Sequence, residues 1–220
     1  MTNQQDTFLA SEGNKWFERN KNSLLADEKD LPIRIITLYN LKPKNILEIG
    51  CSNGFRLRFL KKKLMCNCTG IEPSEQAIED GKNKYKDIRF VRGVCSNIPL
   101  NKTFDLIIVN FVLHWVDRNN LNKCISEIDR LLKTNGHLIL GDFLPDKPTI
   151  NKYHHLPESD VKTFKQDYAN LFVSSKEYIH LAHLSTTHSN LKKLISEKNS
   201  NERVSVSLLL KKDLSKVKDD

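Results

Sequence analysis

The chain has 220 residues, 39% of them hydrophobic and 28% charged, and 35 Lys and Arg against 27 Asp and Glu give a net charge of +8. This length and composition suit one soluble globular domain with appendages better than two equal domains. No apolar run reaches the roughly 20 residues that span a bilayer, and the polar N-terminus lacks the order of a signal peptide, so we expect a cytoplasmic protein without a membrane segment.

The positive charge leaves two kinds of partner open. It could attract phosphate-bearing partners such as RNA or a nucleotide-linked substrate. The lysines are nevertheless spread along the chain, which favours the interpretation that they form a solvated surface.

The five cysteines are odd in number and scattered along the chain, which indicates a reducing compartment. Cys66 and Cys68 are separated by one residue, a spacing that does not match a zinc knuckle. We therefore expect no metal.

Short apolar runs alternate with amphipathic segments. Helices are expected near Thr7 to Asn22 and Leu31 to Leu41. The strand-like runs that follow are 45–50, 68–72, 88–93, 104–111 and 136–143. Helix-like segments such as Leu121 to Leu132 lie between them, with apolar residues at three- and four-residue steps. Near-continuous apolar strands separated by helices predict a parallel sheet covered on both faces.

Beyond Asp146 the alternation weakens. We expect a helix from Asp160 to Phe172, strands at 177–185 and 202–210, and a loose tail at 213–220. The expected organisation is a single domain over residues 1–220. Its parts are a helical cap (1–41), a cofactor-binding core (42–145), and a substrate-side insert with the final strands (146–212).

The first strand ends in a glycine turn, "GCSNG" from Gly50 to Gly54, which opens a helix. Ligands of doubly wound sheets bind beyond the carboxyl ends of the strands, where exposed helix amides favour electron-rich groups. The glycine spacing fits neither a dinucleotide site nor a phosphate loop. Glu48, before the turn, would repel a pyrophosphate and suits a ligand that carries positive charge.

A second carboxylate, Glu72, ends the second strand about 20 residues beyond the turn, where an acidic side chain can accept hydrogen bonds from both ribose hydroxyls. A ribose-bearing ligand with a cationic portion and no polyphosphate describes S-adenosylmethionine.

From Asn45 to Phe143 the chain resembles the class I S-adenosylmethionine-dependent methyltransferases, most closely the small-molecule type. "LEIGCSNG" is similar to the family's first motif and "GIEPS" to the second, followed in order by "GVCSNIPL", "FDLIIVNFVLHWVD" and "LLKTNGHLIL". The resemblance implies an α/β fold with a Rossmann-like, doubly wound, seven-stranded and mainly parallel sheet. Helices would cover both faces, and the last strand would be antiparallel.

The resemblance also implies which residues contact S-adenosylmethionine: Glu48, Gly50, Cys51, Ser52, Asn53, Gly54, Glu72, Pro73, Cys95, Ser96 and Asn110. Ser52 replaces the family's middle glycine, which is tolerable if that residue needs no positive φ. Val94 stands where many members place an aspartate that reads the adenine amino group. Main-chain groups near Cys95 and the Ser96 hydroxyl are expected to recognise adenine instead.

Methyl transfer depends on orientation and water exclusion, and it needs a base only when the nucleophile must lose a proton early. His114, just after the fourth strand, could be that base, because imidazole titrates near neutrality. Packing of the turn is its alternative role. The second candidate comes from the adjacent pair His154 and His155. Adjacent residues on an extended chain cannot both face inward, so at most one of them acts, and His155 is favoured.

The remaining substrate-side candidates come from the N-terminal helix and from the segment after the fifth strand; they are Trp16, Arg19, Tyr153, His154 and Tyr168. The leading hypothesis is a methyltransferase for a small polar acceptor such as a sugar, with no nucleic-acid or membrane partner, acting as a monomer or homodimer. The alternatives are an RNA or other macromolecule methyltransferase and a cofactor-binding regulator without catalysis.

Overall fold

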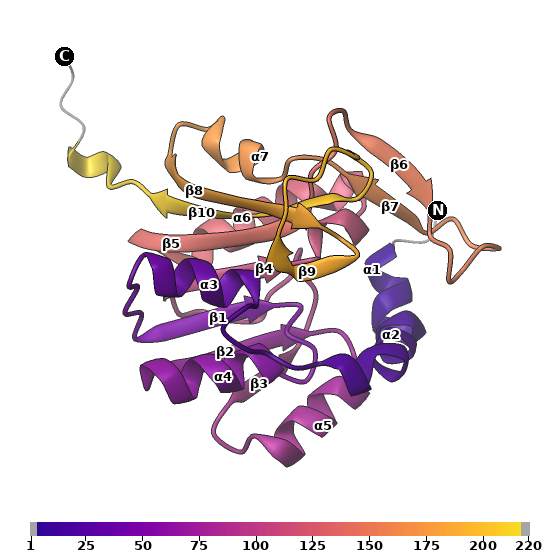
Figure 1. Cartoon of the computed structure of the whole chain (residues 1–220). Helices are drawn as coiled ribbons and strands as arrows, with labels where there is room; N and C mark the ends of the chain where they lie inside the picture. The colour runs from indigo at the N-terminus through magenta and orange to yellow at the C-terminus, as the bar shows by residue number, and fades with distance from the viewer. Residues whose placement is uncertain (1–3, 217–220) are drawn as a thin grey trace.

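The computed structural model describes residues 4–216, and its centre is an eight-stranded sheet in the order β3-β2-β1-β4-β5-β10-β8-β9 (Figure 1). Neighbouring strands among β1 to β5 pair in parallel, whereas β10 is antiparallel to both β5 and β8. The strand bounds are β1 Asn45–Ile49, β2 Asn67–Glu72, β3 Arg89–Arg92, β4 Phe104–Asn110, β5 Leu132–Phe143, β8 Tyr178–Thr187, β9 Asn190–Leu194 and β10 Arg203–Lys211.

The helices cover both faces of this sheet. Their bounds are α3 Leu31–Leu38, α4 Phe55–Leu64, α5 Glu75–Lys84, α6 Arg118–Leu131 and α7 Ala169–Val173. Alternate residues of β1 belong to different cores: Leu47 packs in the cluster that contains α6, and Ile46 in the cluster that contains α3 and α4. Burial on both faces explains why the central strands are apolar throughout, and it confirms the doubly wound α/β fold.

A helical segment precedes the sheet and runs from Gln4 to Ser23. It consists of α1 (Gln4–Thr7), a π-helical turn (Phe8–Glu12), α2 (Gly13–Asn20) and a 3₁₀ turn (Lys21–Ser23). The Gln4 side chain donates to the carbonyls of Trp115 and Lys162, at 2.9 and 3.1 Å. The segment therefore lies across the carboxyl ends of the parallel strands, where a doubly wound sheet binds its ligands.

The C-terminal part differs from expectation in two places. The prediction of a helix from Asp160 to Phe172 is wrong. In that segment β7 (Lys162–Lys165) pairs with β6 (Thr149–Lys152), and only the start of α7 is helical. Cross-strand pairing has overridden the helical spacing of this segment. The main sheet also has one strand more than the seven expected, because β9 adds a hairpin to β8.

In the expected loose tail, residues 214–216 form a 3₁₀ turn, and residues 217–220 lie outside the described part of the chain. Across residues 4–216, every helix is too short or too polar to span a bilayer.

Candidate functional site

The glycine turn after β1 is built from left-handed backbone. Gly50, Ser52 and Gly54 have φ of 72°, 50° and 78°. A Cβ on Gly50 would lie 2.4 Å from a methyl carbon of Val112, so only glycine fits there. Serine was expected to be tolerated at position 52 only if its φ is not positive. The φ of Ser52 is positive, so the serine is strained here. Its left-handed backbone costs about 1–2 kcal/mol relative to an ordinary conformation.

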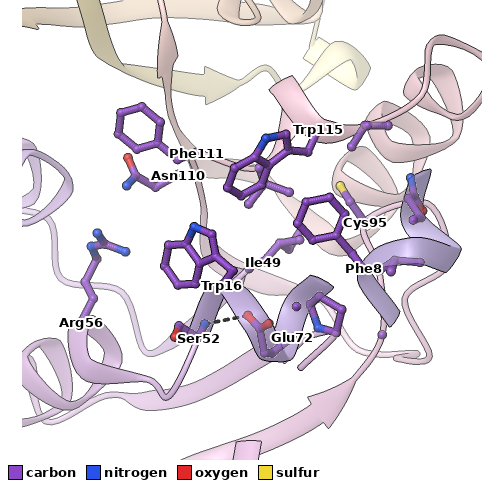
Figure 2. A pocket seen from close by; sticks show the side chains of 18 of the residues that line it. Phe8, Trp16, Ile49, Ser52, Arg56, Glu72, Cys95, Asn110, Phe111 and Trp115 are labelled. Atoms are coloured by element: carbon purple, nitrogen blue, oxygen red, sulfur yellow. Dashed lines mark hydrogen bonds between the residues drawn. The ribbon is translucent and has the colours of Figure 1, made fainter. Parts of the chain in front are cut away.

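Glu72 ends β2 directly beside this turn. One carboxylate oxygen accepts the backbone N–H of Ser52 at 2.8 Å (Figure 2), and the other accepts that of Ser74 at 3.0 Å. Burial raises the pKa of Glu72 to about 7, although both hydrogen bonds act to lower it. Each carboxylate oxygen keeps a lone pair with which to accept a further hydrogen bond from a ligand.

These groups line a cavity of about 260 Å³ at the carboxyl ends of the strands. Seven of the residues predicted from sequence line it, namely Trp16, Gly50, Ser52, Glu72, Pro73, Cys95 and Asn110. The aromatic residues Phe8, Phe111 and Trp115 complete much of the wall and were not predicted for the site. Phe8 and Trp115 stack with ring centroids 5.0 Å apart, so the helical segment at the N-terminus closes one side of the cavity.

Three buried polar atoms in the cavity-lining residues have no hydrogen-bond partner in the described part of the chain. They are the Ser52 hydroxyl, the Asn110 carbonyl oxygen and the Trp115 indole N–H. A buried polar group without a partner costs about 1–3 kcal/mol. A bound polar ligand could supply the missing hydrogen bonds of Ser52 and Trp115, whereas the Asn110 oxygen lies against Gly141 of β5.

The other predicted cofactor residues lie behind the wall; they are Glu48, Cys51, Asn53, Gly54 and Ser96. The Asn53 amide donates to Asp80 at 2.8 Å, and the Ser96 hydroxyl donates to Gln5, which itself lines the cavity. Ser96 therefore supports the cavity wall from outside, whereas Asn53 ties the turn to α5.

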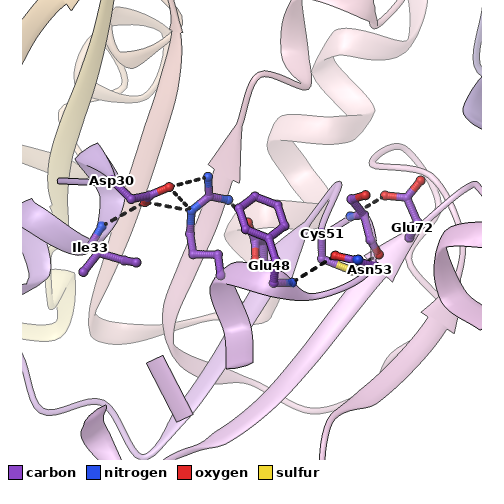
Figure 3. Close-up of polar contacts among 9 residues, drawn as sticks. Asp30, Ile33, Glu48, Cys51, Asn53 and Glu72 are labelled. Atoms are coloured by element: carbon purple, nitrogen blue, oxygen red, sulfur yellow. Dashed lines mark hydrogen bonds and ion pairs between the residues drawn. The ribbon is translucent and has the colours of Figure 1, made fainter. Parts of the chain in front are cut away.

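Glu48 is fully buried and forms an ion pair with Arg56, whose guanidinium also binds Asp30 at 2.9 Å (Figure 3). Burial raises the pKa of Glu48 to about 7, against the opposing effect of Arg56. Burial alone would lower the pKa of Arg56, but Asp30 and Glu48 raise it further above its usual range.

Arg56 lines the cavity, although it was not predicted as a site residue from the sequence. Its position could have indicated a role at the site, because Arg56 stands between the apolar residues Phe55 and Leu57 directly after the glycine turn.

His114 lies in the 3₁₀ turn after β4 (Leu113–Trp115) and is 2% exposed. Its Nδ1 lies 3.0 Å from a carboxylate oxygen of Asp142 on β5, and its ring packs 4.3 Å from that of Trp115. His114 does not line the cavity itself but lies directly behind Phe111 and Trp115.

The remaining candidates lie outside the cavity wall. Arg19 and Tyr153 meet at the buried carboxylate of Glu12, where the Tyr153 hydroxyl donates at 2.9 Å. His154 and His155 are exposed beside Tyr153, with ring centroids 3.9 Å apart. The structure therefore brings Arg19, Tyr153 and the histidine pair together.

Tyr168 is buried at another place. Its hydroxyl donates to the Phe164 carbonyl at 2.6 Å and accepts from Arg118 at 3.1 Å.

Phe111 shapes the side of the cavity next to Asn110. Its φ of 56° is rare for a bulky side chain, and such strain concentrates at functional sites. The ring packs edge-on against Phe143 and His188, at 5.6 and 5.9 Å, which fixes its orientation. Leu191 of β9 also lines the cavity, so the extra hairpin contributes to the same site.

Comparison with known proteins places part of the chain in a described family. Residues 47–140 match the family model described as a methyltransferase domain. An uncharacterized methyltransferase of Alkaliphilus oremlandii is 30% identical over 96 residues, which are 44% of each chain. A malonyl-[acyl-carrier protein] O-methyltransferase of Halalkalibacterium halodurans is 28% identical over 113 residues, or 48% of this chain and 41% of the relative. This chain thus spans less than half the length of each of these relatives.

Among solved structures, the Burkholderia thailandensis 1,6-didemethyltoxoflavin-N1-methyltransferase superposes with a TM-score of 0.69 at 14% identity, over 95% of this chain and 87% of that one. This likeness shows that the two chains share a fold. The family match over residues 47–140 identifies this part of the chain as a methyltransferase domain, and the superposition shows that the whole chain shares its fold.

Proposed function

We propose that the chain is an S-adenosylmethionine-dependent methyltransferase that binds its cofactor in the cavity beside the glycine turn. The observation that carries this proposal is the Glu72 carboxylate, fixed by two backbone N–H groups at the cavity wall. It is positioned to accept hydrogen bonds from both ribose hydroxyls. The unpartnered polar atoms of Ser52 and Trp115 fit a ligand with many hydrogen-bonding groups.

The cavity also suits the cationic part of this cofactor. Trp16 and Trp115 present aromatic rings to it, with centroids 6.5 Å apart, and ring faces attract cations by about 0.5–2 kcal/mol. The bound cofactor supplies an activated methyl group. The chain's own contribution is to orient the acceptor in line with that methyl group and to exclude water from the closed cavity.

A small acceptor fits this geometry better than a macromolecule, because the N-terminal helical segment covers the cavity. Phe111, Trp115 and Leu191 form an apolar wall beside Asn110. This wall favours an acceptor with an apolar or flat portion and gives a sugar less support. His114 remains a candidate base, because Asp142 orients its ring, but it could reach an acceptor only if Phe111 or Trp115 moved.

Isothermal titration calorimetry with S-adenosylhomocysteine tests the cofactor assignment. We expect saturable binding that weakens at least about tenfold in Glu72→Ala, since hydrogen bonds to a charged group contribute about 1.5–3 kcal/mol. Glu79→Ala, an exposed glutamate on α5, is the matched control and should bind as the wild type does. Absence of binding, or equal affinity in Glu72→Ala, would overturn the proposal.

The catalytic part needs a separate experiment. Incubation with S-adenosylmethionine that carries a labelled methyl group should transfer the label to a small compound from a metabolite extract. Transfer to extracted RNA would favour the macromolecule alternative. Cofactor binding without transfer to either pool would favour the non-catalytic regulator.

A further inference from the structure

Two basic side chains meet beyond the aromatic wall of the cavity, at the ring of Phe143 on the end of β5. Lys165 of β7 places its ammonium nitrogen 4.0 Å from the centre of this ring. His188 lies in the turn between β8 and β9 and stacks on the same ring, with centroids 5.1 Å apart. Lys165 and His188, the basic pair, therefore reach one place from two separate hairpins.

This place adjoins the cavity through Phe111. The Phe111 ring contacts His188 at 5.9 Å and Phe143 at 5.6 Å, and Phe111 also lines the cavity, so it separates the cavity from His188. Leu191, three residues after His188, lines the cavity as well. A bound acceptor that extends past Phe111 or Leu191 would therefore meet the basic pair.

Lys165 carries a charge that no carboxylate balances. Its ammonium donates to the carbonyl of Asn201 at 3.1 Å, which leaves two N–H groups for a ligand. The side chain is partly buried, yet it belongs to none of the ion pairs among residues 4–216. A partly buried charge without a counter-ion is unfavourable, and an anionic ligand would relieve that cost.

The surroundings of His188 are positive as well. Burial lowers its pKa, and the charges of Lys165 and His114 lower it further, against the raising effect of the exposed Glu202. Its ring nitrogens have no hydrogen-bond partner within the part of the chain that the structure describes. A neutral imidazole donates one N–H. The basic pair thus offers hydrogen-bond donors and a positive charge, which together match an anion.

We propose that Lys165 and His188 form an anion subsite for the methyl acceptor, an inference that rests on the proposed function. The acceptor carries a carboxylate or phosphate group at one end and a flat or apolar portion at the other. The apolar portion packs beside Phe111 and Leu191, and the anionic group extends beyond them to the basic pair. The methylated atom lies inside the cavity, so the subsite orients the acceptor and takes no part in the transfer itself.

The test uses three probes, titrated by NMR into the protein saturated with S-adenosylhomocysteine. They are benzoate, phenyl phosphate and benzamide, which is the neutral counterpart of benzoate. At least one anionic probe should bind about tenfold more tightly than benzamide, as expected for a charge-assisted hydrogen bond. Tighter binding of benzoate would identify a carboxylate as the preferred group, and tighter binding of phenyl phosphate would identify a phosphate.

Two variants locate the effect. Lys165→Met keeps the chain over Phe143 and removes the charge, and it should reduce the preference to within about twofold. His188→Phe keeps a ring against Phe143 and removes the donor, and it should reduce the preference several-fold. Lys162→Met is the matched control, since Lys162 is an exposed lysine on the same strand, and it should keep the full preference. All three variants should bind S-adenosylhomocysteine as the wild type does.

Failure of both anionic probes to bind, or binding no tighter than that of benzamide, would overturn the subsite while leaving the proposed function intact. Equal losses in Lys165→Met and Lys162→Met would show that only the overall charge matters and would also overturn it. Absence of S-adenosylhomocysteine binding to the wild type would overturn both proposals. If Lys165→Met does not fold, an unchanged preference in His188→Phe would contradict the subsite.

Discussion

The backbone N–H of Ser52 donates to a carboxylate oxygen of Glu72 across 2.8 Å, which ties the turn after β1 to the end of β2. The hydrogen bond is made by the left-handed conformation of Ser52, at φ 50°. The strained residue of the turn therefore positions the carboxylate on which ribose binding is proposed to depend. Strain and function meet at the same residue.

Ser52→Gly should stabilise the ligand-free protein. Glycine relieves the left-handed strain, about 1–2 kcal/mol, and removes a buried hydroxyl without a partner, while the flexibility of glycine costs about 0.5–1 kcal/mol. The melting temperature should rise by about 1–4 °C, as measured by calorimetry. Affinity for S-adenosylhomocysteine should fall, because Ser52 lines the cavity and glycine loosens the turn. A lower melting temperature would show that the Ser52 conformation is not strained.

Cofactor affinity should depend on pH through Glu72. Its pKa is raised to about 7, so the carboxylate loses its charge and one acceptor position as the pH falls below 7. Affinity for S-adenosylhomocysteine should rise about tenfold from pH 6 to pH 8, as the ionised fraction rises to near one. Glu72→Gln should bind more weakly and with less pH dependence, and Glu48, which titrates in the same range in both proteins, cancels in the comparison. Parallel pH profiles of the two proteins would contradict this role of Glu72.

Asp30→Ala should destabilise the protein by about 3 kcal/mol. Asp30 caps α3 by accepting the N–H of Ile33 at 3.3 Å, and it binds the buried guanidinium of Arg56. Asp27→Ala is a control of the same chemistry, since its pair with Lys192 is exposed and contributes at most about 1 kcal/mol. Urea unfolding measures the free energy of unfolding of both variants. If Asp30→Ala lowers this free energy no more than Asp27→Ala does, the buried network does not stabilise the fold.

Gly141→Ala should weaken cofactor binding with little change in fold. The added Cβ would lie 1.9 Å from the amide oxygen of Asn110, and a flexible side chain yields before the sheet does. We expect the Asn110 side chain to turn away and the affinity for S-adenosylhomocysteine to fall several-fold. The unfolding midpoint in urea should change little. Unchanged affinity would show that the orientation of Asn110 does not matter to binding.

The amino-acid pattern predicted the core of the fold because both faces of the central strands are buried, which gives apolar runs that are easy to recognise. It failed at β6, β7 and β9, which are short and contain no buried residue, so that pairing with a neighbour and not composition makes them strands.

At the site, the glycine turn and Glu72 could be predicted because their roles follow from the backbone and the strand end. Arg56 and Phe111 could not, because their positions depend on how α4 and β4 pack against distant segments. Glu48 was placed in the ligand site from its position in the motif, but the structure pairs it with Arg56, a contact that the motif alone does not reveal.

A crystal structure with S-adenosylhomocysteine bound tests the central claim most directly. The account predicts both ribose hydroxyls within hydrogen-bonding distance of the Glu72 carboxylate, with the sulfur beside the rings of Trp16 and Trp115. A ligand bound outside this cavity, or ribose hydroxyls that make no contact with Glu72, would contradict it.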